Sequence, residues 1–173
     1  MALSPVGLLI GEECENYNVR IVGLDVGERR IGVAVSDATL TLARPVEVLR
    51  PGSLERDAPQ LAAAAIARLA EQEDDAVSTI VVGLPRRLDG SPTEMTARVE
   101  AFAAELERLT GLRVIGQDER LTSREAESRL AATDKDWRSR KSRLDAAAAA
   151  IILQDYLDVR PGRPVPLAAD PEL

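Results

Sequence analysis

Acidic residues at three places in this sequence are candidates for chemistry, because they adjoin or interrupt segments that are otherwise apolar. Asp25 lies in the run "RIVGLDV", Asp118 and Glu119 follow "LRVIGQ", and Asp145 begins "DAAAAAIILQDYL". A charge that is taken out of water without a partner is strongly disfavoured. Carboxylates that converge repel one another unless a cation neutralises them, so the expected occupant is Mg²⁺ or Mn²⁺.

Each of these acids also has an ordinary structural explanation. Asp25 precedes Gly27, as an acid in a turn does, and Asp118 and Glu119 lie where a strand end meets solvent. Asp145 falls in the first turn of its expected helix, where the helix dipole stabilises an anion. Side chains alternate along a strand, so only one of Asp118 and Glu119 shares a side with Asp25, and alternation does not say which.

The sequence contains no histidine, and this absence restricts the chemistry that the acids can take part in. It excludes Ser-His-Asp and Cys-His catalysis, a histidine general base and zinc sites with histidine ligands. The one cysteine, Cys14, can form no internal disulfide, which agrees with a reducing cytoplasm. Carboxylates and hard divalent cations remain as the means for acid–base or metal chemistry.

The elements that must position these acids follow from hydrophobic periodicity and capping signals. Strands are expected at residues 19–25, 31–36, 43–49, 78–83 and 112–117, and helices at 54–75, 91–110, 122–131 and 142–157. Pro59 is tolerable only near a helix start, and Ser91 and Glu94 are the expected capping box of the second helix. Hairpin-joined strands followed by crossover units predict an α/β domain.

The last helix gives the strongest reason to bring the acids together. Positions 145, 149, 152 and 156 lie on one stripe of that helix, and they carry Asp, Ala, Ile and Tyr. Asp145 therefore continues the apolar face that we expect to pack on the sheet. Ligands of α/β domains gather beyond the carboxyl ends of strands, where Asp25 and one strand-end acid can join Asp145.

Positive charge is clustered, although the formal net charge of −7 argues mildly against a nucleic-acid partner. The segment "KDWRSRKSR" at residues 135–143 holds five basic residues and one acid. Arg29 and Arg30, and Arg86 and Arg87, lie in loops that we expect near the same strand ends. These groups predict a phosphate-binding rim, while Trp137 fits a base-stacking platform and a packing anchor about equally well.

The two ends of the chain are expected to lie outside the folded domain. Residues 1–18 are predicted to be a mobile extension, and residues 159–173 a proline-rich disordered tail. The opening segment lacks the basic start of a secretory signal, and no apolar run approaches the ~20 residues of a membrane span. We therefore expect a cytoplasmic protein without a membrane partner.

Four segments together resemble the YqgF/RuvX family. They are "GLDVGERRIGVAVSD", "IVVGLPRRLDGS", "DERLTSREAESRL" and "LDAAAAAIILQDYL", and they span about residues 20–158 in this order. Members of this family are small RNase H-like proteins, similar to the Holliday junction resolvase RuvC and described as pre-16S rRNA nucleases. The resemblance implies a single RNase H-like domain at residues 19–158, with a mixed sheet flanked by helices.

The resemblance also implies the site. It places the catalytic, metal-binding acids at Asp25, Glu119 and Asp145, and so prefers Glu119 to Asp118. It implies a phosphodiester hydrolase that uses two Mg²⁺ or Mn²⁺ ions. RuvC-like resolvases carry a further acid near the last aspartate, whereas residues 144 and 146–149 are Leu and four Ala here. The residues expected to contact nucleic acid are Arg30, Gly83, Pro85, Arg86, Arg120, Arg138, Arg140 and Lys141.

The expected function is processing of the 5′ end of pre-16S rRNA in ribosome biogenesis, with RNA or ribosomal precursor particles as partners. One alternative is a Holliday junction resolvase of DNA recombination and repair, for which a homodimer suits two opposed cuts, whereas a monomer suits RNA cleavage. A second alternative is a non-catalytic nucleic-acid-binding assembly factor. An ATPase of the actin and sugar-kinase type shares the Asp-x-Gly turn but needs a second lobe, for which 173 residues leave no room.

Overall fold

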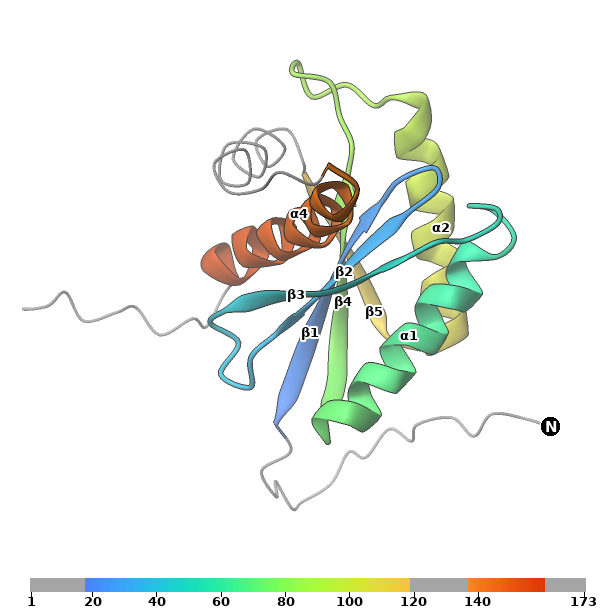
Figure 1. Ribbon diagram of the computed structural model, residues 1–173. Coiled ribbons are helices and arrows are strands. Elements are labelled where there is room, and N and C mark those ends of the chain that lie inside the picture. The colour runs from blue at the N-terminus through green and yellow to red at the C-terminus, as the bar shows by residue number, and fades with distance from the viewer. Residues whose placement is uncertain (1–17, 119–136, 161–173) are drawn as a thin grey trace, which may run out of the picture.

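The computed structural model describes residues 18–118 and 137–160, which build one mixed five-stranded sheet between helices (Figure 1). The strands are β1 (Val19–Val26), β2 (Ile31–Ser36), β3 (Ala43–Leu49), β4 (Ala76–Leu84) and β5 (Arg113–Asp118). Their order across the sheet is β3-β2-β1-β4-β5. The pairs β1–β2 and β2–β3 are antiparallel, and β4 runs parallel to both β1 and β5. The predicted succession of hairpins and crossover units is confirmed.

Three helices in the described residues cover the sheet, and each face has its own apolar core. Helices α1 (Ala58–Glu73) and α2 (Glu94–Thr110) lie on one face, and α4 (Trp137–Val159) lies across the other (Figure 1). Val22 and Leu24 of β1 belong to the core under α1 and α2. Ile21 packs instead with Ile152 and Leu153 of α4. Because β1 alternates in this way, Asp25 falls on the α4 face.

Helix α4 approaches the sheet closely because two strand positions carry no side chain. A Cβ placed on Gly32 of β2 would lie 1.9 Å from the carbonyl oxygen of Asp145. A Cβ on Gly23 of β1 would lie 2.6 Å from Cβ of Leu153. Neither contact leaves room for a methyl group, so these glycines are required by packing. They set the height of α4 above the sheet.

A glutamine fixes the position of α4 along the sheet as well. The backbone N–H of Ala43 donates to Oε1 of Gln154 at 2.9 Å, and Nε2 of Gln154 donates to the carbonyl oxygen of Thr41, also at 2.9 Å. Both amide atoms of one side chain thus satisfy backbone groups at the start of β3. Together with the glycine contacts, these bonds fix the helix at two points along its length.

The start of α4 differs from the prediction. Residues 137–141 were expected as a loop before a helix that begins near 142, but α4 begins at Trp137. Arg and Lys favour helix, and neither Gly nor Pro interrupts residues 137–145. Asp145 is therefore about two turns inside the helix rather than in its first turn. The dipole acts within the first turn, so it does not explain an acid at this position.

The start of α2 is also corrected. Its N-cap is Thr93, whose side chain accepts from the N–H of Thr96, while the Thr96 hydroxyl accepts from the N–H of Thr93. The predicted cap Ser91 donates instead to Asp89, and its carbonyl oxygen accepts from the N–H of Arg87. The loop before α2 thus closes on itself and postpones the helix by two residues. The other end agrees with the prediction, because Gly111 follows α2 with φ of 69°.

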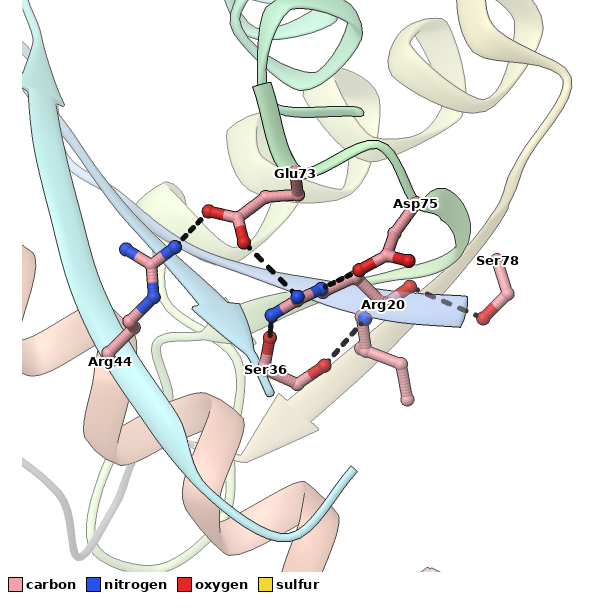
Figure 2. A network of polar contacts seen from close by, with 7 residues as sticks. Arg20, Ser36, Arg44, Glu73, Asp75 and Ser78 are labelled. Atoms are coloured by element: carbon pink, nitrogen blue, oxygen red, sulfur yellow. Dashed lines mark hydrogen bonds and ion pairs between the residues drawn. The ribbon is translucent and has the colours of Figure 1, made fainter. Parts of the chain in front are cut away.

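A network of charged and polar groups joins the amino-terminal end of the sheet to α1 (Figure 2). Arg20 of β1 donates from Nε to Asp75 at 2.6 Å and from Nη1 to the carbonyl oxygen of Ser36 at 3.0 Å. Its Nη2 lies 3.2 Å from Glu73, which also pairs with Arg44 of β3. The Asp75 side chain is 9% exposed. The charged side chains of this network pair with one another, so we assign them a structural role.

Several predictions fall on residues that the structure does not describe. They are the helix at 122–131 and nearly all of the two terminal segments, of which residues 1–17 and 161–173 lie outside the described ranges. Within the described ranges, no helix combines the length and the apolar character that crossing a membrane requires.

Candidate active site

The carboxyl ends of the three parallel strands meet at one edge of the sheet. β1 pairs with β4 through Leu24 and Val82, so the next residues, Asp25 and Gly83, lie level with each other. Gly83 in turn pairs with Gln117 of β5. In Figure 1 the β1–β2 hairpin and the loop after β4 both project from this end of the sheet. This is the edge at which α/β folds bind their ligands.

Asp145 is brought to the same place as Asp25 by the glycine that pairs with Asp25. Asp25 pairs with Gly32 across the β1–β2 ladder. The backbone of Asp145 lies directly over Gly32, at the contact that leaves no room for a side chain. Both acids are half-buried rather than fully exposed. Two of the three predicted acids therefore converge on the α4 face of the sheet, at its carboxyl end.

Arg30 supplies a positive charge next to these acids. Its Nη1 donates to Oδ2 of Asp145 at 3.2 Å, and each of the two side chains is 27% exposed. The turn that carries Arg30 is closed by a bond of 2.8 Å from the N–H of Gly27 to the Arg30 carbonyl oxygen. The predicted basic residue thus does lie at the site, where it holds a carboxylate. The sequence did not indicate this pairing.

Asp118 is excluded as the acid that shares a face with Asp25. It pairs with Leu84, and both lie on the face that α1 and α2 cover, together with Gly116 and Val114. Glu119 and Arg120, which the resemblance favours, lie outside the described residues.

The described residues offer oxygen donors for a cation, but not a complete site. Within residues 18–118 and 137–160, no group of three Asp, Glu or Cys side chains is arranged to hold a metal ion. Asp25 and Asp145 provide two carboxylates, which are the ligands that hard divalent cations prefer. Their chemistry and their shared face therefore fit the expected ion. Mg²⁺ is commonly held by one or two carboxylates together with water or phosphate oxygens. The resemblance predicts Glu119 as a third acid.

The loop between β4 and α2 borders this edge and is held by its own polar groups. The Thr96 hydroxyl donates to the carbonyl oxygen of Pro85, and Arg86 donates from Nη1 to the carbonyl oxygen of Gly90 at 3.1 Å. Arg86 is half-buried, whereas Arg87 is exposed. Leu88, in the middle of the loop, is 91% exposed. Arg86 thus helps to shape the loop, and Arg87 presents the more accessible charge.

Three further basic residues precede Asp145 on the same helix. The backbones of Arg138, Arg140 and Lys141 lie in the first turns of α4 instead of the predicted loop. Because this helix continues into Asp145, these residues are connected to the acids by regular secondary structure. The predicted basic segment therefore leads into the site through a helix.

Sequence reasoning overlooked Gln117. It lies level with Gly83 and on the α4 side of β5, since its neighbours Gly116 and Asp118 fall on the opposite side. Gly83 lies between Asp25 and Gln117 on the middle strand, β4. Because it has no side chain, no β4 side chain lies between those two residues. Counting back two residues from Glu119 would have identified this polar position, because side chains on a strand repeat every second residue.

The sequence of this chain matches known proteins over nearly its whole folded part. The family model "RuvX: Holliday junction resolvase" matches residues 19–159. A protein of Anaeromyxobacter sp. (strain Fw109-5) is 46% identical over 142 residues, which cover 82% of this chain and 98% of that protein. One of Halalkalibacterium halodurans is 42% identical over 140 residues, or 81% and 96% of the two chains. Both are named "Putative pre-16S rRNA nuclease".

Solved structures resemble the fold at low sequence identity. RuvC of Thermus thermophilus in complex with a Holliday junction substrate has a TM-score of 0.45 and 16% identity, over 81% of this chain and 95% of that chain. The ROK hexokinase of Thermus thermophilus has a TM-score of 0.42 and 22% identity. That match covers 62% of this chain but only 38% of the hexokinase, so this chain spans about two fifths of its length. The expected mixed sheet flanked by helices is confirmed by the topology of the described residues.

Proposed function

The chain belongs to the RuvX family, and from this premise we propose that it is a metal-dependent nuclease that processes the 5′ end of pre-16S rRNA. The reaction is hydrolysis of a phosphodiester bond in structured RNA. The proposal places the protein in the cytoplasm, acting during ribosome biogenesis on precursor RNA or precursor particles. Residues 19–158 are its nuclease domain in this proposal.

The convergence of Asp25 and Asp145 carries this proposal. The two acids are 120 positions apart in the sequence, yet they meet at Gly32 on one face of the sheet. Two half-buried carboxylates near each other raise the electrostatic free energy unless positive charge is nearby. Arg30 provides one positive charge here, and an active site that holds cations gives a reason for keeping two acids on this face.

Asp25, Asp145 and Glu119 would hold one or two Mg²⁺ or Mn²⁺ ions in this scheme. Such ions, when bound, stabilise the charge that develops on a phosphoryl group and its leaving oxygen. The carboxylates provide the negative charge that keeps the cations in place. Gly83 adds no side chain beside Asp25, so it does not compete for the space next to that carboxylate. The sequence offers no histidine as a general base.

Basic side chains around the acids would bind the phosphate backbone. Arg30 and Arg87 border the edge, and Arg138, Arg140 and Lys141 lie before Asp145 on α4. Contacts of this kind fix the position of a nucleic acid without reading its sequence. Gln117 adds a neutral group that can donate and accept hydrogen bonds at the same level.

Holliday junction resolution is the second candidate, because the description of the matching family names it. It uses the same hydrolysis on a different substrate. A homodimer would support it, since two sites must cut two opposed strands. The residues beside Asp145, Leu144 and Ala146 to Ala149, include no fourth acid, which is a departure from RuvC-like resolvases.

A cleavage assay with Mn²⁺ separates these functions. The full chain is incubated with single-stranded RNA, with a structured RNA that contains the 5′ leader of pre-16S rRNA, and with a four-way DNA junction. We expect cleavage of the leader RNA by the wild type and by Asp158→Asn, which alters an exposed acid of the same helix. Asp145→Asn should be inactive. Cleavage of the junction alone would establish the resolvase, and binding without any cleavage would support the assembly factor.

A further inference from the structure

Arg30 makes a contact that conflicts with the proposed role of its partner. Its guanidinium holds Oδ2 of Asp145 at 3.2 Å, although Asp145 is the acid that would bind a cation. The backbone of Asp145 is fixed by its contact with Gly32, so only the side chain is able to change partner. Both side chains are 27% exposed and therefore within reach of ions and of a substrate.

The physical consequence is competition. A carboxylate that is paired with a guanidinium must give up that pair, wholly or in part, when a doubly charged ion binds to it. The bound ion then repels the guanidinium, because like charges in a half-buried site interact strongly. A released guanidinium at this edge finds its best alternative partner in a phosphate, which it binds in a bidentate manner.

We propose that Arg30 couples cation binding to nucleic-acid binding by exchanging the Asp145 carboxylate for a substrate phosphate. In the ligand-free protein Arg30 neutralises Asp145. A divalent cation on Asp145 frees Arg30 for a phosphate, and a phosphate on Arg30 frees Asp145 for the cation. Coupling of this kind is reciprocal, so each ligand strengthens the binding of the other by the same factor. The inference rests on the proposed metal site.

The neighbouring Arg29 provides a matched control. It lies in the same turn and is exposed, and Arg29→Gln removes the same charge as Arg30→Gln. The difference between the two variants therefore isolates the contact with Asp145 from the general field of a cation. Arg30→Lys retains the charge but loses the planar fork that binds phosphate at two points.

The experiment measures Mn²⁺ affinity by calorimetry and by the electron paramagnetic resonance of free Mn²⁺. Each variant is titrated alone and with a 2′-O-methyl RNA 12-mer that carries phosphorothioate linkages, whose integrity is checked afterwards. Thermal unfolding confirms that the variants fold. Asp145→Asn serves as the test of the metal site itself.

Without RNA, Arg30→Gln should bind Mn²⁺ about two- to fivefold more tightly than wild type, as expected for the loss of a partly exposed ion pair. Arg29→Gln should stay close to wild type. With RNA at a saturating concentration for each variant, wild type and Arg29→Gln should gain more Mn²⁺ affinity than Arg30→Gln does. Arg30→Lys should resemble wild type without RNA and show a smaller gain with it.

Two results would overturn the proposal, and they are distinguishable. If Asp145→Asn lowers Mn²⁺ affinity while Arg30→Gln and Arg29→Gln behave alike in both titrations, the metal site stands and the exchange does not occur. If Asp145→Asn binds Mn²⁺ as well as wild type, the metal site itself is wrong, and the coupling fails with it.

Discussion

Asp145 lies against the residue that pairs with Asp25 in the sheet. The carbonyl oxygen of Asp145 occupies the space that a side chain on Gly32 would need, and Gly32 is the partner of Asp25 in the β1–β2 ladder. One glycine therefore sets the separation of two acids that the sequence places far apart. Arg30, two residues before this glycine, then pairs with the acid from the helix.

Gly32→Ala should disrupt both stability and the site. The added methyl group would lie 1.9 Å from the Asp145 carbonyl oxygen, so α4 must move away from the sheet. Overpacking of this kind costs about 1–3 kcal/mol, which urea denaturation will measure. Mn²⁺ affinity should fall as well. Gly52→Ala is the control, because a Cβ there meets only the flexible side chain of Asp57.

Asp25→Asn should bind RNA with nearly wild-type affinity and lose cleavage by at least about 100-fold, as expected when a ligand of a catalytic ion is neutralised. Gel-shift titration in Ca²⁺ measures the binding, and product formation in Mn²⁺ measures the rate. The matched variant Asp89→Asn changes an exposed acid of the β4–α2 loop and should retain at least half of the rate. Full activity of Asp25→Asn would refute the assignment.

Arg20 and Asp75 should show strong coupling in a double-mutant cycle. Arg20→Met leaves the Asp75 carboxylate, which is 9% exposed, without its partner at 2.6 Å. Loss of one member of such a partly buried pair costs about 2–4 kcal/mol. The further change Asp75→Asn should recover about 1 kcal/mol or more of this loss. Chemical denaturation of the four proteins provides the test, and simple additivity of the two changes would contradict the contact.

Cleavage should be insensitive to this pair at temperatures where the variants are folded. The network of Arg20 (Figure 2) lies at the amino-terminal end of β1. Asp25 lies near the carboxyl end of the same strand. Opposite ends of one strand are far apart, so a change at Arg20 should leave the acids in place. A loss of rate in folded Arg20→Met would show that the two ends are linked.

Asp37 should make folding stability depend on pH in the acid range. Burial raises the pKa of this carboxyl, but hydrogen bonds from Thr39, Leu42 and Thr41 outweigh burial and lower it from 3.8 to about 2. Because folding lowers the pKa of Asp37, its carboxylate stabilises the folded state at pH values above the ordinary pKa of 3.8. This contribution to the free energy of unfolding is lost as pH falls from 3.8 to about 2.

Asp37→Asn removes this titration. At pH 7 the variant should be less stable by about 1 kcal/mol, since the carboxylate is partly exposed and its bonds are screened. Denaturation at several pH values measures the free energy of unfolding of both proteins. The difference between them should shrink as pH falls toward 2. A difference that stays constant over this range would contradict the role of the charge. Thr110→Ala, which changes an uncharged residue at the end of α2, should give such a constant difference.

The sequence by itself determined the strands, most of the helices and which acids were unusual. These features depend on local patterns: alternation allows only one of Asp118 and Glu119 to share a side with Asp25, and the stripe at 145, 149, 152 and 156 places Asp145 toward the sheet. The absence of histidine restricts the chemistry through composition alone, whatever the fold. The resemblance to the RuvX family was likewise carried by short local segments.

Only the tertiary structure decided how these parts meet. The contact of Asp145 with Gly32 and the ion pair between Asp145 and Arg30 join positions that are more than 110 residues apart. The bonds from Gln154 to the backbone of Thr41 and Ala43 likewise join positions that are more than 110 residues apart. Local patterns fix which way a side chain faces along its own element, but packing between elements fixes which side chains it encounters.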